Sequence, residues 1–242
     1  MPEQSETVEK SIQRVLGIFA HPDDPEFFCG ATFARWAAEG ADVTFVLATS
    51  GDKGSGDLEM THERLIEIRE QEERNAAAAL GVNEVIFLRY PDGELEPNLQ
   101  LRRDVTRVIR MKKPDAVVTI DPERVYGREY INHPDHRAIG TAVIDAVYPT
   151  ARDHLNFIEL ARDEGLAPHK VKYVYLSGPK EVTTRVDVTH FIETKINALR
   201  EHKSQISDME GMASRIRERT IDPESSVDQP RHIESFFVIT LG

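Results

Sequence analysis

The chain has 242 residues, one cysteine and a formal net charge of −12 at pH 7. A lone cysteine excludes an intrachain disulfide and a cysteine-based zinc site, and the acidic balance argues against nonspecific nucleic-acid binding, which needs a basic surface. No apolar run approaches the ~18–20 residues that span a membrane, and residues 1–9 lack the apolar core of a signal peptide. The sequence therefore predicts a cytoplasmic protein without nucleic-acid or membrane partners.

Apolar runs and helical segments alternate along the first half of the chain. Buried strands are predicted at residues 15–20, 43–48, 84–89 and 116–120. Helices are predicted between them, at residues 26–39, 62–80 and 99–112. This alternation predicts a Rossmann-like, three-layer α/β/α fold with a mostly parallel sheet, because parallel strands are joined by crossover helices.

The second half of the chain has a weaker pattern. It predicts helices at residues 137–147 and 191–203 and strands at residues 171–176 and 236–239. Residues 210–229 are polar and poorly patterned, which predicts a mobile loop or an interface arm of a homo-oligomer, and residues 1–12 are expected to form a flexible N-terminus. No repeat or linker divides the chain, so residues 1–242 are predicted to be a single domain.

Polar side chains gather where the predicted strands end. His21 and Asp24 follow the first strand, and residues 50–52, 91–93 and 121–136 follow the next three. Ligands of parallel α/β sheets bind beyond the C-terminal ends of the strands. The sequence therefore predicts a functional site at that edge of the sheet.

Two His-Pro-Asp segments, at residues 20–26 and 132–136, carry most of the candidate chemistry. A His/carboxylate set without thiols is typical of a catalytic metal site, in which three protein ligands leave one position open. His21 and Asp24 can face one point from the same turn, and His136 is the natural third ligand. Spacing alone does not distinguish Asp23 from Asp24, and either segment by itself is also typical of a simple turn with a capping Asp.

The other polar residues of these segments have candidate roles in hydrolysis. A carboxylate beside the metal is suited to act as general base toward water, because the metal lowers the pKa of that water. His133 is a candidate to stabilise the developing oxyanion or the leaving amine, and Asp135 is a candidate to orient an imidazole.

The order of the motifs resembles the PIG-L/LmbE-like zinc-dependent N-acetylglucosaminyl de-N-acetylases. The matching segments cover most of the chain and lie at residues 15–26, 29–32, 69–81, 91–95, 133–136, 195 and 202–205. The resemblance implies that His21, Asp24 and His136 bind Zn²⁺, although His/Asp sites also accept other divalent transition metals.

The resemblance also implies roles for residues around the metal. Asp23 corresponds to the general base, and His133 to the group that assists at the oxyanion or leaving group. Arg69 and Asp92 are implied to face the substrate.

One feature departs from the family pattern. Some relatives have a tyrosine close before the second motif that helps to polarise the carbonyl. Here Tyr126 and Tyr130 lie further back, and whether either reaches the site is left open.

The predicted activity is hydrolysis of an N-acyl group, in the first instance acetyl, from an N-acetylglucosamine-type amino sugar or conjugate. One alternative is an amidase acting on a thiol-sugar conjugate or another amide. A second alternative is a non-catalytic metal- or ligand-binding relative, against which the presence of both Asp23 and His133 argues. The glycine-rich residues 51–56 lack the spacing of a P-loop or a dinucleotide fingerprint, so a phosphate site has little support.

Overall fold

The structure is a computed structural model that describes residues 12–242, so the predicted flexible N-terminus lies outside it except for Ile12, which is buried. Within this range the chain forms a seven-stranded sheet in the order β3-β2-β1-β4-β5-β7-β6. The strands are β1 (Arg14–Phe19), β2 (Asp42–Thr49), β3 (Glu84–Tyr90), β4 (Ala116–Ile120), β5 (Tyr173–Ser177), β6 (Thr184–Asp187) and β7 (Ile233–Thr240). Strands β1 to β5 run parallel, while β7 pairs antiparallel with β5 and β6. The predicted mostly parallel sheet is confirmed.

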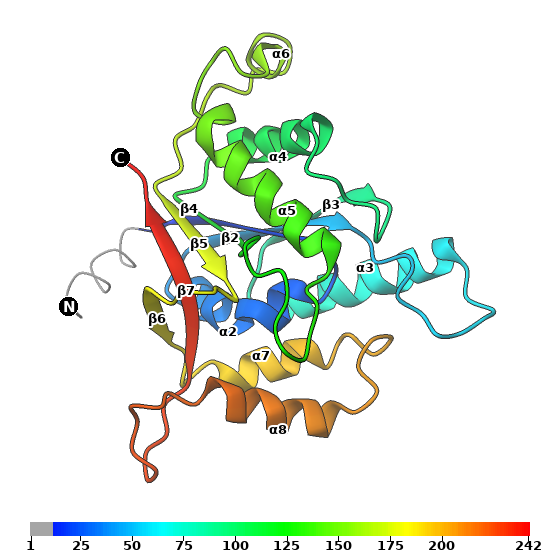
Figure 1. Cartoon of the computed structure of the whole chain (residues 1–242), viewed down its shortest axis with the longest axis vertical. Coiled ribbons are helices and arrows are strands. Elements are labelled where there is room, and N and C mark those ends of the chain that lie inside the picture. Colours follow the sequence, from blue (N-terminus) through cyan, green and yellow to red (C-terminus); the bar gives the residue numbers. More distant parts are fainter. Residues whose placement is uncertain (1–11) are drawn as a thin grey trace.

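Helices cover both faces of this sheet (Figure 1). One face carries α2 (Asp24–Ala38) and α3 (His62–Ala79). Helix α7 (Ile192–Leu199) packs on these two helices, and α8 (Met209–Thr220) packs outside α7. The other face carries α4 (Leu99–Lys112), α5 (Pro134–Asp145) and η1 (Ala146–Thr150), with α6 (Ile158–Arg162) beyond them. Among the helices of residues 12–242, none combines the length and apolar character needed to cross a membrane.

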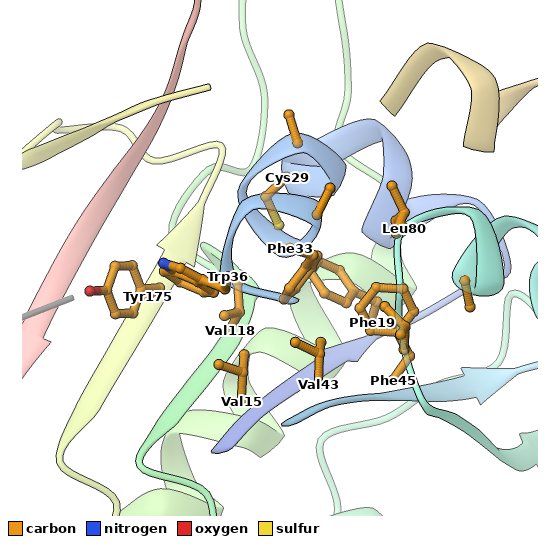
Figure 2. Close-up of a cluster of buried hydrophobic side chains, with 14 of the residues drawn as sticks. Val15, Phe19, Cys29, Phe33, Trp36, Val43, Phe45, Leu80, Val118 and Tyr175 are labelled. Atoms are coloured by element: carbon orange, nitrogen blue, oxygen red, sulfur yellow. The ribbon is translucent and has the colours of Figure 1, made fainter. Parts of the chain in front are cut away.

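Strand β1 is buried on both faces, as its uninterrupted apolar run predicts. On the α2 side, Phe33 packs edge-on against Phe19 and Phe45, with ring centroids 6.2 and 4.7 Å apart (Figure 2). On the other side, Leu16 and Ile18 belong to a second buried cluster. This packing holds the C-terminal end of β1, where the chain turns into the first His-Pro-Asp segment.

Two helices begin earlier than predicted, within the His-Pro-Asp segments themselves. Helix α2 begins at Asp24 rather than at residue 26, and α5 begins at Pro134 rather than at residue 137. Pro25 and Pro134 lie in the first turns, where the N–H that proline lacks has no helical partner. Both segments therefore place their polar side chains at helix N-termini.

Residues 210–229 differ from the predicted mobile loop, because residues as far as Thr220 belong to α8. The Asp208 side chain caps this helix by accepting a hydrogen bond from the Gly211 N–H (2.9 Å). Ala213 and Ile216 are buried against α7. The loop prediction was wrong as far as Thr220 because the apolar stripe is narrow, and the helix is stabilised by tertiary packing rather than by its own pattern. The interface arm stays a prediction.

Candidate metal centre

The candidate site lies at the C-terminal edge of the parallel strands. His21 follows β1, Asp24 begins α2, and Asp92 follows β3. The long loop after β4 returns at the N-terminus of α5, which carries His133 and His136 (Figure 1). The fold thus brings the two His-Pro-Asp segments together, as predicted.

His21, Asp24 and His136 form one compact donor group. One donor atom from each lies within 4.8 Å of the other two. Nδ1 of His21 lies 3.4 Å from Oδ2 of Asp24, and Nε2 of His136 lies 3.0 Å from Oδ1 of the same carboxylate. Two imidazole nitrogens and a carboxylate oxygen are the donor set of many catalytic zinc sites, so these residues fit a divalent metal.

A second donor group shares His21 with the first. Nε2 of His21 lies 3.1 Å from Oδ1 of Asp92, and these two residues form a compact group with His133. The same Nε2 is 3.3 Å from Oδ2 of the fully buried Asp135. Asp92, which the resemblance placed toward the substrate, therefore also contacts a candidate metal ligand.

The carboxylates around His21 favour positive charge at this position. Burial opposes a charged His21, but hydrogen bonds to Asp135, Asp24 and Asp92 outweigh it and raise the pKa of His21 to about 12. Burial also opposes ionisation of Asp24, yet His136 and His21 hold the pKa of Asp24 far below its usual value. Three carboxylates in contact with one imidazole make this position electrostatically suited to a cation.

Asn132 orients His136 by a side-chain contact that the sequence alone did not predict. Its Oδ1 lies 3.0 Å from Nδ1 of His136, which leaves Nε2 of that ring facing Asp24. Partners of this kind fix the orientation of metal-binding imidazoles.

Asp23 is not part of this donor group, which separates the two neighbouring aspartates that spacing alone left equivalent. Its φ is 99°, a strained left-handed value for a non-glycine residue. Its backbone N–H donates to Oε2 of Glu73 (3.0 Å), and its Oδ2 lies 3.3 Å from Nη2 of Arg69. Burial is the main reason that the pKa of Asp23 rises to about 6.

Arg69 is buried and holds the loops around Asp23. It donates to the carbonyl oxygens of Pro22 (2.7 Å) and Gly51 (3.1 Å). A Cβ on Gly51, whose φ is 65°, would lie 2.2 Å from the Arg69 guanidinium. The glycine-rich loop therefore encloses Arg69.

His133 and Asp135 both contact His21. The His133 ring centroid is 4.7 Å from that of His21, and its side chain is 42% exposed, so it can reach a ligand. Burial, then the nearby His21, lowers the pKa of His133. Asp135 is fixed by N–H groups of Gly93 (2.7 Å) and Leu95 (3.2 Å).

The two tyrosines left open by the sequence lie on the loop after β4. Tyr126 is 76% exposed. The hydroxyl of Tyr130 accepts a hydrogen bond from Nε of Arg124, whose guanidinium also covers the Tyr130 ring.

A buried cluster of two glutamates and a histidine lies beside Asp23 and was not predicted from the sequence. Glu26, Glu73 and His202 have fully buried side chains, and Nε2 of His202 is 3.4 Å from Glu26 and 3.9 Å from Glu73. Burial raises the pKa of Glu26 to about 8. Glu26 and His202 belong to motifs noted in the sequence, but nothing in their local pattern indicates that they meet.

Fold and site together define a class: a Rossmann-like α/β protein with a candidate catalytic metal centre at the edge of its sheet. The sequence profile of the PIG-L family, described as GlcNAc-PI de-N-acetylase, matches residues 16–147. The chain belongs to the PIG-L family. The predicted family resemblance is therefore confirmed.

Two relatives of similar sequence are deacetylases. Diacetylchitobiose deacetylase of Thermococcus kodakarensis is 32% identical over 197 residues, which cover 81% of this chain and 72% of that protein. 1D-myo-inositol 2-acetamido-2-deoxy-alpha-D-glucopyranoside deacetylase of Saccharomonospora viridis is 28% identical over 274 residues, covering 94% and 95%. These relatives are hydrolases, which supports the predicted enzyme class.

Solved structures agree with this assignment. N,N'-diacetylchitobiose deacetylase from Pyrococcus horikoshii matches with a TM-score of 0.86 and 29% identity, over 97% of this chain and 86% of that one. The 4-carboxy-2-hydroxymuconate hydratase GalB of Pseudomonas putida matches with a TM-score of 0.76 at 17% identity, over 95% and 97%. The second match shows the fold alone.

Proposed function

We propose that this protein removes the acetyl group from an N-acetylglucosamine-type amino sugar or its conjugate. The proposal rests on the different contacts of two adjacent aspartates. Asp24 lies beside two imidazoles, whereas Oδ2 of Asp23 lies 3.3 Å from Nη2 of Arg69. A site that only bound a metal has no need of the second, separately held carboxylate. The names of the relatives, deacetylases of diacetylchitobiose and of an acetamido-glucopyranoside of inositol, support the substrate class.

The metal, zinc in the first instance, would be held by His21, Asp24 and His136. When bound, it supplies a Lewis acid that polarises the acyl oxygen and makes water easier to deprotonate. Asp92 and Asp135 hold His21 from its other nitrogen, which fixes the ring.

Asp23 is the proposed general base, and its carboxylate takes the proton from the attacking water. A base is most efficient when its pKa lies near the working pH, and burial moves the pKa of Asp23 in that direction. Arg69 keeps the carboxylate in place, and Arg69 and Asp92 are proposed to border the sugar. His133, half-buried and next to His21, is proposed to stabilise the oxyanion or to protonate the departing amine.

The test is amine release by metal-loaded protein across a panel of N-acetylglucosamine conjugates. Asp23→Ala is expected to keep its metal and to lose most turnover, whereas His136→Ala is expected to lose the metal. His154→Ala, at an exposed histidine, is the matched control. Asp23→Ala with wild-type turnover contradicts the proposal, and release confined to a non-acetyl amide of a thiol-sugar conjugate favours the amidase alternative.

A further inference from the structure

Helix α2 is interrupted at Cys29, whose φ and ψ of −155° and 32° are not helical. Before the break, the first turn of the helix carries Asp24. Beyond it, Phe33 and Trp36 are buried in the core that covers this face of the sheet (Figure 2). The catalytic steps proposed above use none of residues 29–32. A sharp break inside a helix has a physical cause, such as a side chain that enters the ladder of helical hydrogen bonds.

A buried ion pair occupies this break. In a regular helix the N–H of Ala31 donates to the carbonyl oxygen of Phe27. Here the Phe27 carbonyl accepts a hydrogen bond from Nζ of Lys195 (3.0 Å). The Ala31 N–H instead donates to Oε1 of Glu234 (3.3 Å), and that oxygen lies 2.7 Å from Nζ of Lys195. The ion pair is thus inserted between the two groups that a regular helix would join directly.

Both members of the pair are held firmly at the break. Oε2 of Glu234 accepts from the backbone N–H of Thr32 (2.7 Å) and from its hydroxyl (2.6 Å). A Cβ on Gly30 would lie 3.4 Å from Cγ of Lys195, so the lysine stem lies directly against the backbone of the break. The two charged side chains are only 4% and 3% exposed, and in such surroundings hydrogen bonds between ionised groups are strong.

The pair comes from two elements that carry no candidate metal ligand. Lys195 belongs to α7, and Glu234 lies in β7, in the antiparallel part of the sheet. The connection between the first turn of α2 and the rest of this helix therefore depends on side chains from α7 and β7. Helical hydrogen bonds alone would fix it in an unbroken helix.

The first turn of α2 contacts His136 at two points. Oδ1 of Asp24 lies 3.0 Å from Nε2 of His136, and the Phe28 ring packs edge-on against the imidazole, with centroids 5.6 Å apart. Asp24 and Phe28 are four residues apart and so lie on the same side of the turn. The carbonyl that Lys195 holds belongs to Phe27, between them in the chain. A displacement of this turn would therefore move both contacts away from His136.

We propose that Lys195 and Glu234 are positioning residues of the metal centre. By bridging the break in α2, they hold its first turn where Asp24 and His136 converge on one ion. The inference rests on the proposed function, because it concerns the metal that the deacetylase would use. Neither residue touches the metal ligands, so the effect on metal binding passes through the backbone of α2.

The experiment measures the dissociation constant of Zn²⁺ for metal-free protein by competition with a chromophoric chelator. The double variant Lys195→Met/Glu234→Gln removes both charges together and leaves no unpaired buried charge. It is expected to raise the Zn²⁺ dissociation constant about ten- to a hundredfold, the range for groups that orient metal ligands. The visible absorption of the Co²⁺-loaded variant, which reports ligand geometry, is expected to differ from that of wild type.

Lys172→Met/Asp115→Asn is the matched control. It removes another lysine–carboxylate pair (3.1 Å), whose carboxylate also accepts two backbone N–H groups, at the opposite edge of the sheet from the metal centre. In folded protein its Zn²⁺ dissociation constant is expected to stay within about twofold of wild type, because distant sites act independently. Urea titrations identify the conditions under which every variant is folded.

Wild-type Zn²⁺ affinity in the Lys195/Glu234 double variant overturns the inference, as does an equal loss of affinity in the control. If the double variant does not fold, Thr32→Val decides, because it removes only the hydroxyl that holds Glu234. It is expected to raise the dissociation constant about two- to tenfold, the equivalent of one hydrogen bond, and an unchanged constant overturns the inference. These measurements need no substrate. Protein that binds Zn²⁺ through the pair but releases no amine refutes the proposed function alone.

Discussion

Replacing Glu73 by alanine is expected to reduce turnover without removing the metal. Glu73 touches none of the three candidate metal ligands in the donor group. Its carboxylate accepts the backbone N–H of Asp23 (3.0 Å), the residue held at a φ of 99°. The variant therefore removes a support of the proposed base while leaving the donor group intact.

The magnitude follows from this geometry. Backbone strain at a non-glycine residue with positive φ costs about 1–3 kcal/mol. Burial raises the pKa of Glu73 well above its usual value, which favours the neutral carboxyl, and a hydrogen bond to a neutral acceptor contributes about 0.5–1.5 kcal/mol. The bond from Asp23 to Glu73 therefore offsets part of the strain. Without it the Asp23 backbone relaxes and the carboxylate moves, and a loss of about 1.4–2.8 kcal/mol of transition-state stabilisation lowers kcat by about ten- to a hundredfold. Glu73→Gln keeps an oxygen acceptor, so its loss should be under about tenfold.

The assay measures kcat and KM for amine release, together with the metal content of each purified variant. Glu67→Ala, on an exposed part of the same helix, controls for a general effect on α3. Wild-type kcat in Glu73→Ala would mean that the hydrogen bond from Asp23 to Glu73 does not support the proposed base. So would a Glu73→Gln variant as impaired as Glu73→Ala, because the acceptor oxygen would then be irrelevant.

Three further outcomes test the fold and the metal. Burial raises the pKa of Asp115, but hydrogen bonds from Lys172 and two backbone N–H groups outweigh it and lower that pKa. Asp115→Asn should therefore reduce the free energy of unfolding at neutral pH, and this difference from wild type should vanish as the pH falls through the lowered pKa. Urea titrations at several pH values measure it. Gly140→Ala would place a Cβ 2.4 Å from the Ile120 carbonyl oxygen, so urea unfolding should show a loss of about 1–3 kcal/mol; unchanged stability would contradict this close packing of α5 on β4. A chelator should lower the Tm of wild-type protein but not that of Asp24→Asn, because only the first binds metal in its native state; equal shifts would place the metal elsewhere.

Local sequence was enough to predict the central strands and the sheet edge at which the candidate site residues meet. Residues 43–48 are apolar except for Thr44, and a strand buried on both faces suits such a run in an alternating α/β pattern. Such patterns involve only residues that are adjacent in the chain, so they predict a strand without knowledge of its tertiary contacts. Where local signals are weak they failed: α8 has a narrow apolar stripe, and β6 and α6 are only four and five residues long.

The candidate site groups could be named from the sequence, because the His-Pro-Asp segments follow strands whose ends must meet at one edge. How those groups are placed relative to one another depends on the fold. Asp23 and Asp24 are chemically identical neighbours, yet a positive φ turns Asp23 toward Arg69 while Asp24 faces His136. Their environments differ because hydrogen bonding and burial depend on segments far apart in the chain, and no local pattern encodes those distances.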